Sequence, residues 1–126
     1  MSTWRHTAIK LLPFQKKMIA AAPTPMALWT GLHLEFERWC MYDRLGVARD
    51  IMTYARYCWA APSPEVSTAV AVAFIERLPT KKAVLAILPN YLSADEVRRL
   101  RPILAQHVGD RAIRQLEQTC RRHTAR

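Results

Sequence analysis

The sequence predicts an all-α protein, a compact irregular bundle of about six or seven helices. Apolar residues recur every three or four positions along most of the chain, which is the spacing of helix faces. Typical helix-start and helix-stop residues separate these stretches. With only 3 glycines against 8 prolines in 126 residues, the chain lacks the composition of a hairpin-rich sheet. A chain of this length can bury roughly two-thirds of its unfolded surface, so residues 1–126 are expected to form a single helical domain.

The first helix boundaries lie in the N-terminal third. Pro13 suits the first turn of a helix, so residues 1–12 are expected to be an N-terminal arm or an extra turn. Thr24 is a favourable N-cap for a second helix, expected to run to Leu45 and to end at Gly46. Apolar residues occupy several sides of this second helix, which predicts a central position in the bundle: Trp29, Leu32, Leu34, Phe36, Trp39, Cys40, Met41 and Leu45.

The middle of the chain is expected to contain three further helices. Apolar spacing after Gly46 continues to about Ala60. Ser63 can cap a buried helix that includes residues 66–78, and Thr80 can cap a short one that ends at Leu88 before a proline.

Two helices are expected in the C-terminal third. Residues 93–96, Ser-Ala-Asp-Glu, form the pattern of a capping box. The helix that follows should kink at Pro102 and end at Gly109, and Asp110 should cap the last helix. Residues 121–126 are expected to be a basic tail.

Composition narrows the setting and the class of partner. The formal net charge is +9, from 19 Lys and Arg against 10 Asp and Glu, which favours acidic partners. The 3 cysteines are odd in number and widely spaced, so a disulfide framework is not indicated and a cytoplasmic protein is expected. The apolar stretch at residues 18–34 is interrupted by prolines, which makes it a poor membrane span. No membrane partner is expected.

The motifs of the common enzyme classes are missing from the sequence. It has no glycine-rich phosphate loop and no CxxC, HExxH or GxSxG motif, so no catalytic residue, metal or cofactor is predicted. His33 and Glu37 lie one turn apart and are interpreted as an ordinary intrahelical hydrogen bond. His107, Cys120 and His123 resemble zinc ligands, but a structural zinc site needs four. Their grouping is interpreted as a coincidence.

The main functional hypothesis is a noncatalytic protein-interaction module that binds an acidic protein, such as an adaptor, an inhibitor or an immunity-type protein. Trp, Tyr and Arg are the residues that most often anchor protein interfaces, and they are frequent on two consecutive expected helices. The candidate partner-binding residues are Arg38, Tyr42, Arg56, Tyr57 and Trp59.

The alternative hypothesis is a nucleic-acid-binding accessory protein. Residues 98–126 hold eight arginines against two acidic residues. Ala105 and Gly109 have the spacing of a helix-turn-helix unit, but Gln115 and Gln118 stand where that unit needs apolar residues. The hypothesis is therefore limited to nonspecific contact with phosphates by the arginines of the last two expected helices. These are Arg98, Arg99, Arg101, Arg111, Arg114, Arg121 and Arg122.

Three segments also resemble a family of small uncharacterised bacterial proteins. They are residues 54–59 (YARYCW), residues 66–79 (VSTAVAVAFIERLP) and the helix start at residues 92–95 (LSAD). The resemblance covers roughly residues 28–108. It implies a bacterial setting and a helical domain, and it carries no established activity.

Overall fold

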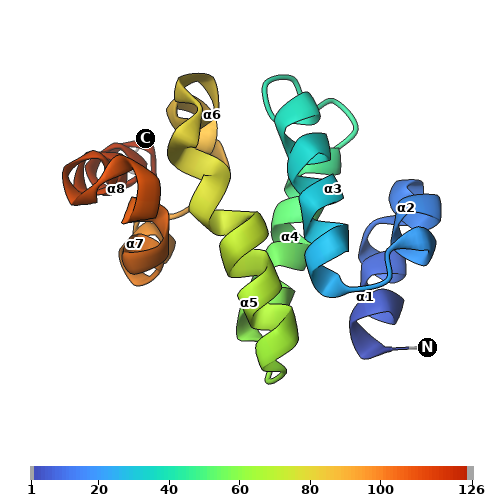
Figure 1. Ribbon diagram of the computed structural model, residues 1–126. Helices are drawn as coiled ribbons and strands as arrows, with labels where there is room; N and C mark the ends of the chain where they lie inside the picture. Colours follow the sequence, from blue (N-terminus) through green and yellow to red (C-terminus); the bar gives the residue numbers. More distant parts are fainter. Residues whose placement is uncertain (1, 125–126) are drawn as a thin grey trace. The chain divides into compact units, whose positions relative to one another are not determined.

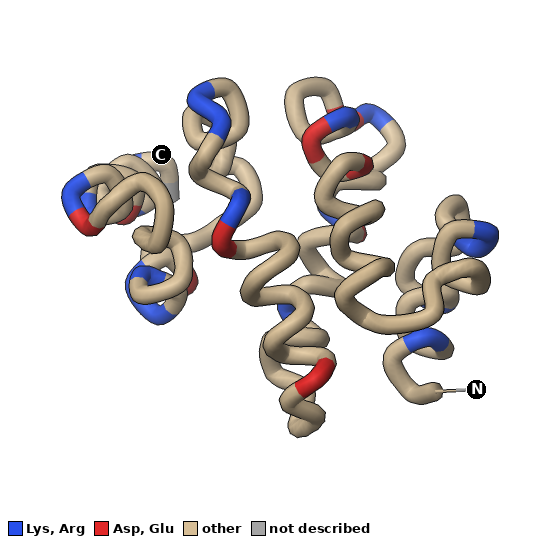
Figure 2. Tube along the Cα trace, viewed as in Figure 1, with Lys and Arg blue, Asp and Glu red and all other residues tan. Residues whose placement is uncertain are grey.

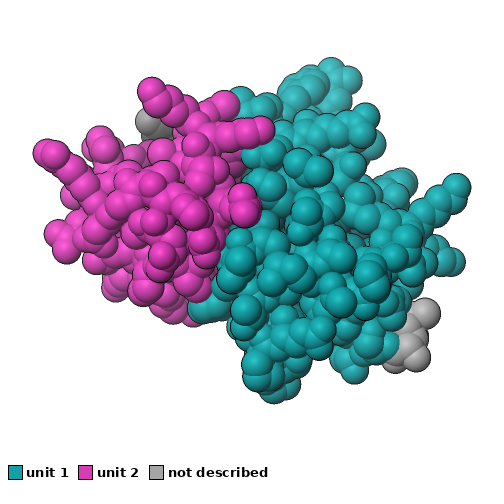
Figure 3. All heavy atoms as spheres, in the orientation of Figure 1, with its two compact units in different colours: residues 1–74 teal, residues 75–126 magenta. Residues whose placement is uncertain are grey.

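The computed structural model describes residues 2–124, which contain eight α-helices, three short 3-10 helices and no strand (Figure 1). The expected all-α class is confirmed, whereas the expected count of six or seven helices is too low. The chain divides into two compact units, residues 1–74 and 75–126 (Figure 3), and each is described by itself. The single domain over residues 1–126 stays a prediction.

The first unit contains five α-helices and one 3-10 helix. Their bounds are α1 (Thr3–Leu11), η1 (Pro13–Gln15), α2 (Lys16–Ala21), α3 (Pro25–Trp39), α4 (Val47–Ala60) and α5 (Pro64–Ala73). The second unit contains η2 (Ile75–Thr80), α6 (Lys82–Ile87), η3 (Leu88–Asn90), α7 (Ala94–Val108) and α8 (Asp110–Thr124).

The N-terminal segment, expected to be an arm or an extra turn, forms the complete helix α1. Ala8 is fully buried in the core of the first unit. The Tyr54 hydroxyl on α4 donates to the Trp4 carbonyl at 3.0 Å, and the Arg5 guanidinium donates to the Ala22 carbonyl at 2.6 Å. These contacts to distant residues fix the helix, and they account for part of the higher helix count.

Stacked aromatic rings form the centre of the first unit. The Trp29 ring of α3 stacks on Tyr54 of α4, with centroids 5.3 Å apart and planes within 12°. Phe74, directly after α5, lies 4.8 Å from Trp29 and meets Phe36 edge-on at 5.3 Å. All four side chains are less than 2% exposed. Aromatic pairs of this kind contribute beyond their buried area, so the cluster joins α3, α4 and α5.

Helix α3 ends six residues earlier than the sequence predicted. It stops at Trp39 rather than Leu45, and Gly46 with φ +73° is the N-cap of α4 instead of a C-cap. The carboxylate of Asp43 accepts hydrogen bonds from the amides of Ala48 and Arg49 at 3.1 and 3.0 Å. Asp43 therefore serves the start of α4, where free amides need an acceptor, and the residues around it form a turn.

Only part of the apolar surface predicted for this segment is buried. Trp29, Leu32 and Phe36 are fully buried, but Leu34 is 62% exposed. Beyond the helix end, Met41 is 55% exposed and Leu45 65% exposed. These apolar side chains face solvent, whereas α3 packs against α2, α4 and α5 through its other residues.

Helix α5 ends at Ala73, whereas the sequence predicted a helix through Leu78. Residues 75–80 instead form the 3-10 helix η2, which includes Pro79. The break comes at Phe74, whose φ of −126° and ψ of −66° lie outside the helical region, five residues before Pro79.

The two predicted caps in this region do not form. Thr80 donates to the Arg77 carbonyl at 2.7 Å, and the N-cap of α6 is Lys81. Ser63 is the N-cap of α5, but its side chain accepts no capping bond there. Both helix starts are therefore set by packing and by backbone bonds rather than by a side-chain cap.

The second unit bears out most expectations for the C-terminal third. The Ser93 hydroxyl accepts from the Glu96 amide at 3.1 Å, and the Glu96 carboxylate accepts from the Ser93 amide at 3.0 Å, so the capping box is confirmed. Helix α7 continues past Pro102 to Gly109, whose φ of +89° suits glycine. Helix α8 extends through residue 124, so most of the expected tail is helical; residues 125–126 lie outside the described part of the chain.

The fold assigns a stabilising role to the Asp43 cap that can be measured. We expect Asp43→Ala to lower the free energy of unfolding by about 1 kcal/mol, because two amides of α4 lose their acceptor. Urea denaturation followed by circular dichroism gives the value. Asp50→Ala is the matched control, since it removes the same charge from the first turn of the same helix. Equal losses in both variants would contradict a specific capping role.

Candidate interaction surfaces

The predicted partner-binding residues are divided between two ends of the first unit. Arg38 and Tyr42 lie at the end of α3 and in the turn after it, whereas Arg56, Tyr57 and Trp59 lie in the last turn of α4. The 14 residues of α4 rise about 21 Å along the helix axis. Figure 1 shows α4 running away from the turn that joins it to α3. The structure therefore does not bring the five residues together.

The second half of α3 and the turn after it carry exposed apolar and basic side chains. We call this set of side chains the corner patch and define it by six residues: Leu34, Arg38, Met41, Tyr42, Arg44 and Leu45. The side chains of Tyr42 and Leu45 are 67% and 65% exposed, and the guanidinium carbon of Arg44 lies over the Tyr42 ring, 4.7 Å from its centroid. Adjacent exposed apolar side chains with a polar rim are typical of interaction sites.

Sequence reasoning missed the apolar half of the corner patch. Leu34, Met41 and Leu45 were assigned to additional buried sides of one long helix. The signal that could have separated them is Asp43, since an aspartate a few residues before a new apolar stripe is a common helix-start residue.

Carboxylates near the corner patch are engaged within the protein. Glu35 accepts from the indole nitrogen of Trp39 at 3.1 Å and lies 4.0 Å from the Arg38 guanidinium. The Asp43 carboxylate binds the amides at the start of α4. The Arg38 side chain is nevertheless 70% exposed. Figure 2 shows basic and acidic residues gathered at this end of α3, and Arg38 and Arg44 place exposed guanidiniums beside the apolar side chains of the corner patch.

The other end of α4 is partly structural. The half-buried Tyr57 ring stacks on Tyr54 with centroids 6.0 Å apart and planes within 16°, extending the aromatic core outward. Arg56 is exposed, and Trp59 is 41% exposed. This end presents one large ring beside one guanidinium, a smaller surface than the corner patch.

Helices α7 and α8 pair many of their arginines internally. The Glu117 carboxylate, only 12% exposed, lies 3.5 Å from Arg98, 3.1 Å from Arg101 and 3.0 Å from Arg121. Asp110 and Arg114 pair at 2.8 Å. Residues 75–126 still hold eleven Lys and Arg against five Asp and Glu, a net charge of +6. The alternative surface is therefore positive, although four of its seven arginines have carboxylate partners.

Two of the histidines, His33 and His107, contact carboxylates. His33 and Glu37 are 3.4 Å apart within α3, which is the predicted contact. His107 lies 2.7 Å from Glu76, so it joins α7 to η2. Within the described residues, no group of three or more His, Cys, Asp and Glu side chains has the arrangement of a metal site.

The cysteines are buried thiols. Cys40, Cys58 and Cys120 are at most 4% exposed, and the structure shows no disulfide among them. Burial raises the pKa of Cys58 to about 11, while hydrogen bonds with Tyr54 and Trp29 act in the opposite direction. Burial, with Glu96 and Glu117 nearby, raises the pKa of Cys120 to about 11. Thiols with such pKa values are poor nucleophiles at neutral pH.

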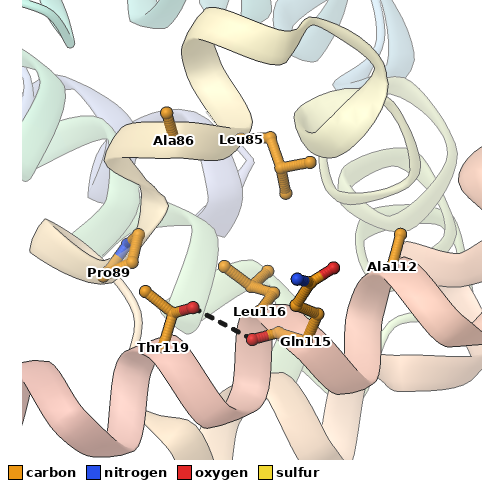
Figure 4. A pocket seen from close by; sticks show the side chains of 7 residues that line it. All are labelled: Leu85, Ala86, Pro89, Ala112, Gln115, Leu116 and Thr119. Carbon is orange, nitrogen blue, oxygen red and sulfur yellow. Dashed lines mark hydrogen bonds between the residues drawn. The ribbon is translucent and has the colours of Figure 1, made fainter.

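A shallow groove lies within the second unit, along one side of α8 (Figure 4). A hollow of about 220 Å³ is bounded by α6 and η3 on one side and α8 on the other, and its apolar lining consists of Leu85, Ala86, Pro89, Ala112 and Leu116. A second hollow of about 360 Å³ shares three of the lining residues and reaches Asn90, Arg122 and His123. The two hollows thus form one groove, apolar at one end and basic at the other.

No helix in residues 2–124 combines the length and the apolar character needed to cross a bilayer. No protein-family model matches the sequence, and no curated protein or solved structure matches it either. The resemblance to small bacterial helical proteins stays a prediction.

Burial of the cysteines predicts a loss of stability at alkaline pH. The thiol of an unfolded chain loses its proton near pH 9, whereas folded Cys58 keeps it until about pH 11. Ionisation therefore stabilises the unfolded state, and the free energy of unfolding should fall between these pH values, by about 2 kcal/mol for this residue. Urea denaturation at pH 8, 9.5 and 11 measures the slope. Cys58→Ala should show a smaller fall, and an unchanged slope would refute the assignment.

Proposed function

We propose that this protein is a noncatalytic protein-interaction module that binds an acidic protein through the corner patch. Adaptors, inhibitors and immunity-type proteins act in this stoichiometric way. The observation that supports the proposal most directly is the exposure of Leu34 on α3 and of Met41, Tyr42 and Leu45 in the turn after that helix. Each apolar side chain of this size contributes about 1.5–3 kcal/mol when it moves fully out of water.

Charge supports the choice of an acidic partner. Arg38 and Arg44 flank the apolar side chains, and the nearest carboxylates, of Glu35 and Asp43, already contact groups of this protein. An acidic surface would bring carboxylates to these guanidiniums, and complementary charge speeds association and excludes basic competitors. Tyr and Arg are also the residues that most often dominate binding energy at interfaces.

The setting that we propose is the cytoplasm of a bacterial cell, without a membrane partner. Buried thiols that form no disulfide are typical of reducing compartments. We further propose that residues 1–126 act together as one compact helical domain with no catalytic residue, metal or cofactor. In this proposal, Arg56, Tyr57 and Trp59 lie outside the main contact.

The partner hypothesis can be tested by affinity purification and variants of the corner patch. We expect tagged wild-type protein to capture an acidic protein, and we expect the double variant Arg44→Glu, Leu45→Ser to bind it at least about tenfold more weakly. Both side chains are exposed, so the fold should be retained. Arg56→Glu is the control for a charge reversal at the other end of α4. If only the control variant loses partner binding, the interface lies at that end of α4 instead.

The second candidate function is nonspecific nucleic-acid binding by the arginines of α7 and α8. It is favoured by the net charge of +6 in residues 75–126. Several guanidiniums on these two helices are well exposed, including those of Arg98, Arg114 and Arg121. Exposed arginines on neighbouring helices could contact successive phosphates, whose affinity depends steeply on salt.

The nucleic-acid hypothesis predicts a salt-sensitive contaminant in the purified protein. The ratio of absorbance at 260 and 280 nm should fall after a high-salt wash. Replacement of Arg111, Arg114, Arg121 and Arg122 by Ala should abolish this retention. If nucleic acid is still retained after the four substitutions, this candidate is eliminated. If nucleic acid is lost and the wild-type protein captures no protein partner, nucleic-acid binding is favoured over the acidic-protein hypothesis.

A further inference from the structure

The groove beside α8 is apolar at one end and basic at the other, and this arrangement favours one class of ligand. Its apolar end lies over Leu85 and Leu116, and its other end reaches Arg122 and His123. Figure 4 shows the Leu85 and Leu116 side chains directed into the space between α6 and α8. Ligand sites are commonly lined by apolar side chains with a few polar groups that orient the ligand.

Side-chain contacts direct the polar groups of α8 along the groove. The Thr119 hydroxyl donates to the Gln115 carbonyl at 3.0 Å, as Figure 4 shows, and the Arg122 guanidinium lies 3.5 Å from the same hydroxyl. Arg122 is therefore held on the groove side of α8. The Asn90 amide and the His123 imidazole line the same end, where they can donate to an anion.

We propose that this groove binds a medium-chain monocarboxylate, with the carboxylate at Arg122, His123 and Asn90 and the alkyl chain along Leu85 and Leu116. A carboxylate suits a guanidinium because two parallel hydrogen bonds can form between them. The binding site is independent of the corner patch, which lies in the other unit.

The length of the groove sets the length of the ligand. From Ala112 to His123, helix α8 rises about 16 Å. Between Leu116 and Arg122, the two α8 residues proposed to hold the ends of the ligand, the rise is about 9 Å. Three bonds of an extended chain advance about 3.8 Å, so a carboxylate of about eight carbons spans this shorter distance. Shorter acids would reach the basic end only, and they should bind more weakly because each buried methylene adds to the affinity.

The test uses octanoate, with octan-1-ol as its uncharged analogue and butyrate as its short analogue. Titration of the ¹⁵N-labelled full chain should give saturable amide shifts in α6, η3 and α8, with octanoate binding more tightly than either analogue. Arg122→Gln should weaken octanoate about fivefold and leave octan-1-ol unchanged, because only the carboxylate uses the guanidinium. Ala86→Trp, at an exposed position of α6, should fill the groove and abolish the binding of both.

Two controls distinguish this site from nonspecific adsorption. Arg114→Gln removes the same charge from the same helix outside the groove, and octanoate should still bind with unchanged affinity. Ala112→Leu narrows the groove from α8 and should weaken binding independently of Ala86→Trp. Octanoate shifts that do not saturate, that spread equally to α3 and α4, or that persist in both filled-groove variants would overturn the proposal. None of these outcomes bears on the corner patch.

Discussion

The Asp43 carboxylate is the constraint on which the candidate interaction surface depends. By accepting two amides at the start of α4, it divides what would otherwise be one long apolar-rich helix into α3, a turn and α4. The turn places Met41, Tyr42 and Leu45 outside the core. A short polar side chain thus decides both where a helix starts and which apolar side chains face solvent.

The two units manage positive charge differently. In residues 75–126 a single carboxylate, Glu117, lies close to three arginines; its pairs with Arg98 and Arg101 join α7 to α8, and its pair with Arg121 lies within α8. At the corner patch the carboxylates are bound to an indole and to backbone amides, and the arginines face outward beside apolar side chains. Exposed ion pairs contribute little to stability, whereas guanidiniums next to an apolar surface are well suited to recognition.

Local chemistry explains the sequence predictions that succeeded. The capping box at Ser93 and Glu96 and the start of α3 after Thr24 depend on side chains that bond within four residues, and the stop at Gly109 depends on the positive φ that glycine tolerates. Where a nearby residue could make a competing contact, the prediction failed. Thr80 bonds backward to Arg77 instead of capping α6. The prediction of the candidate site likewise succeeded only in part. Of the five predicted partner-binding residues, only Arg38 and Tyr42 belong to the corner patch.

The sequence by itself determined the all-helical class, the positions of most helix starts and the burial of one apolar stripe on each long helix, because these follow from periodicity and from contacts between near neighbours. Only the tertiary structure decided which of the remaining apolar and aromatic side chains are covered. Trp29 and Phe74 are buried because a partner ring from another helix meets each of them, whereas Leu34 and Leu45 have the same apolar character and remain exposed. Periodicity shows that a side chain could be buried, but burial requires a surface from elsewhere in the chain, and that surface depends on how distant segments pack.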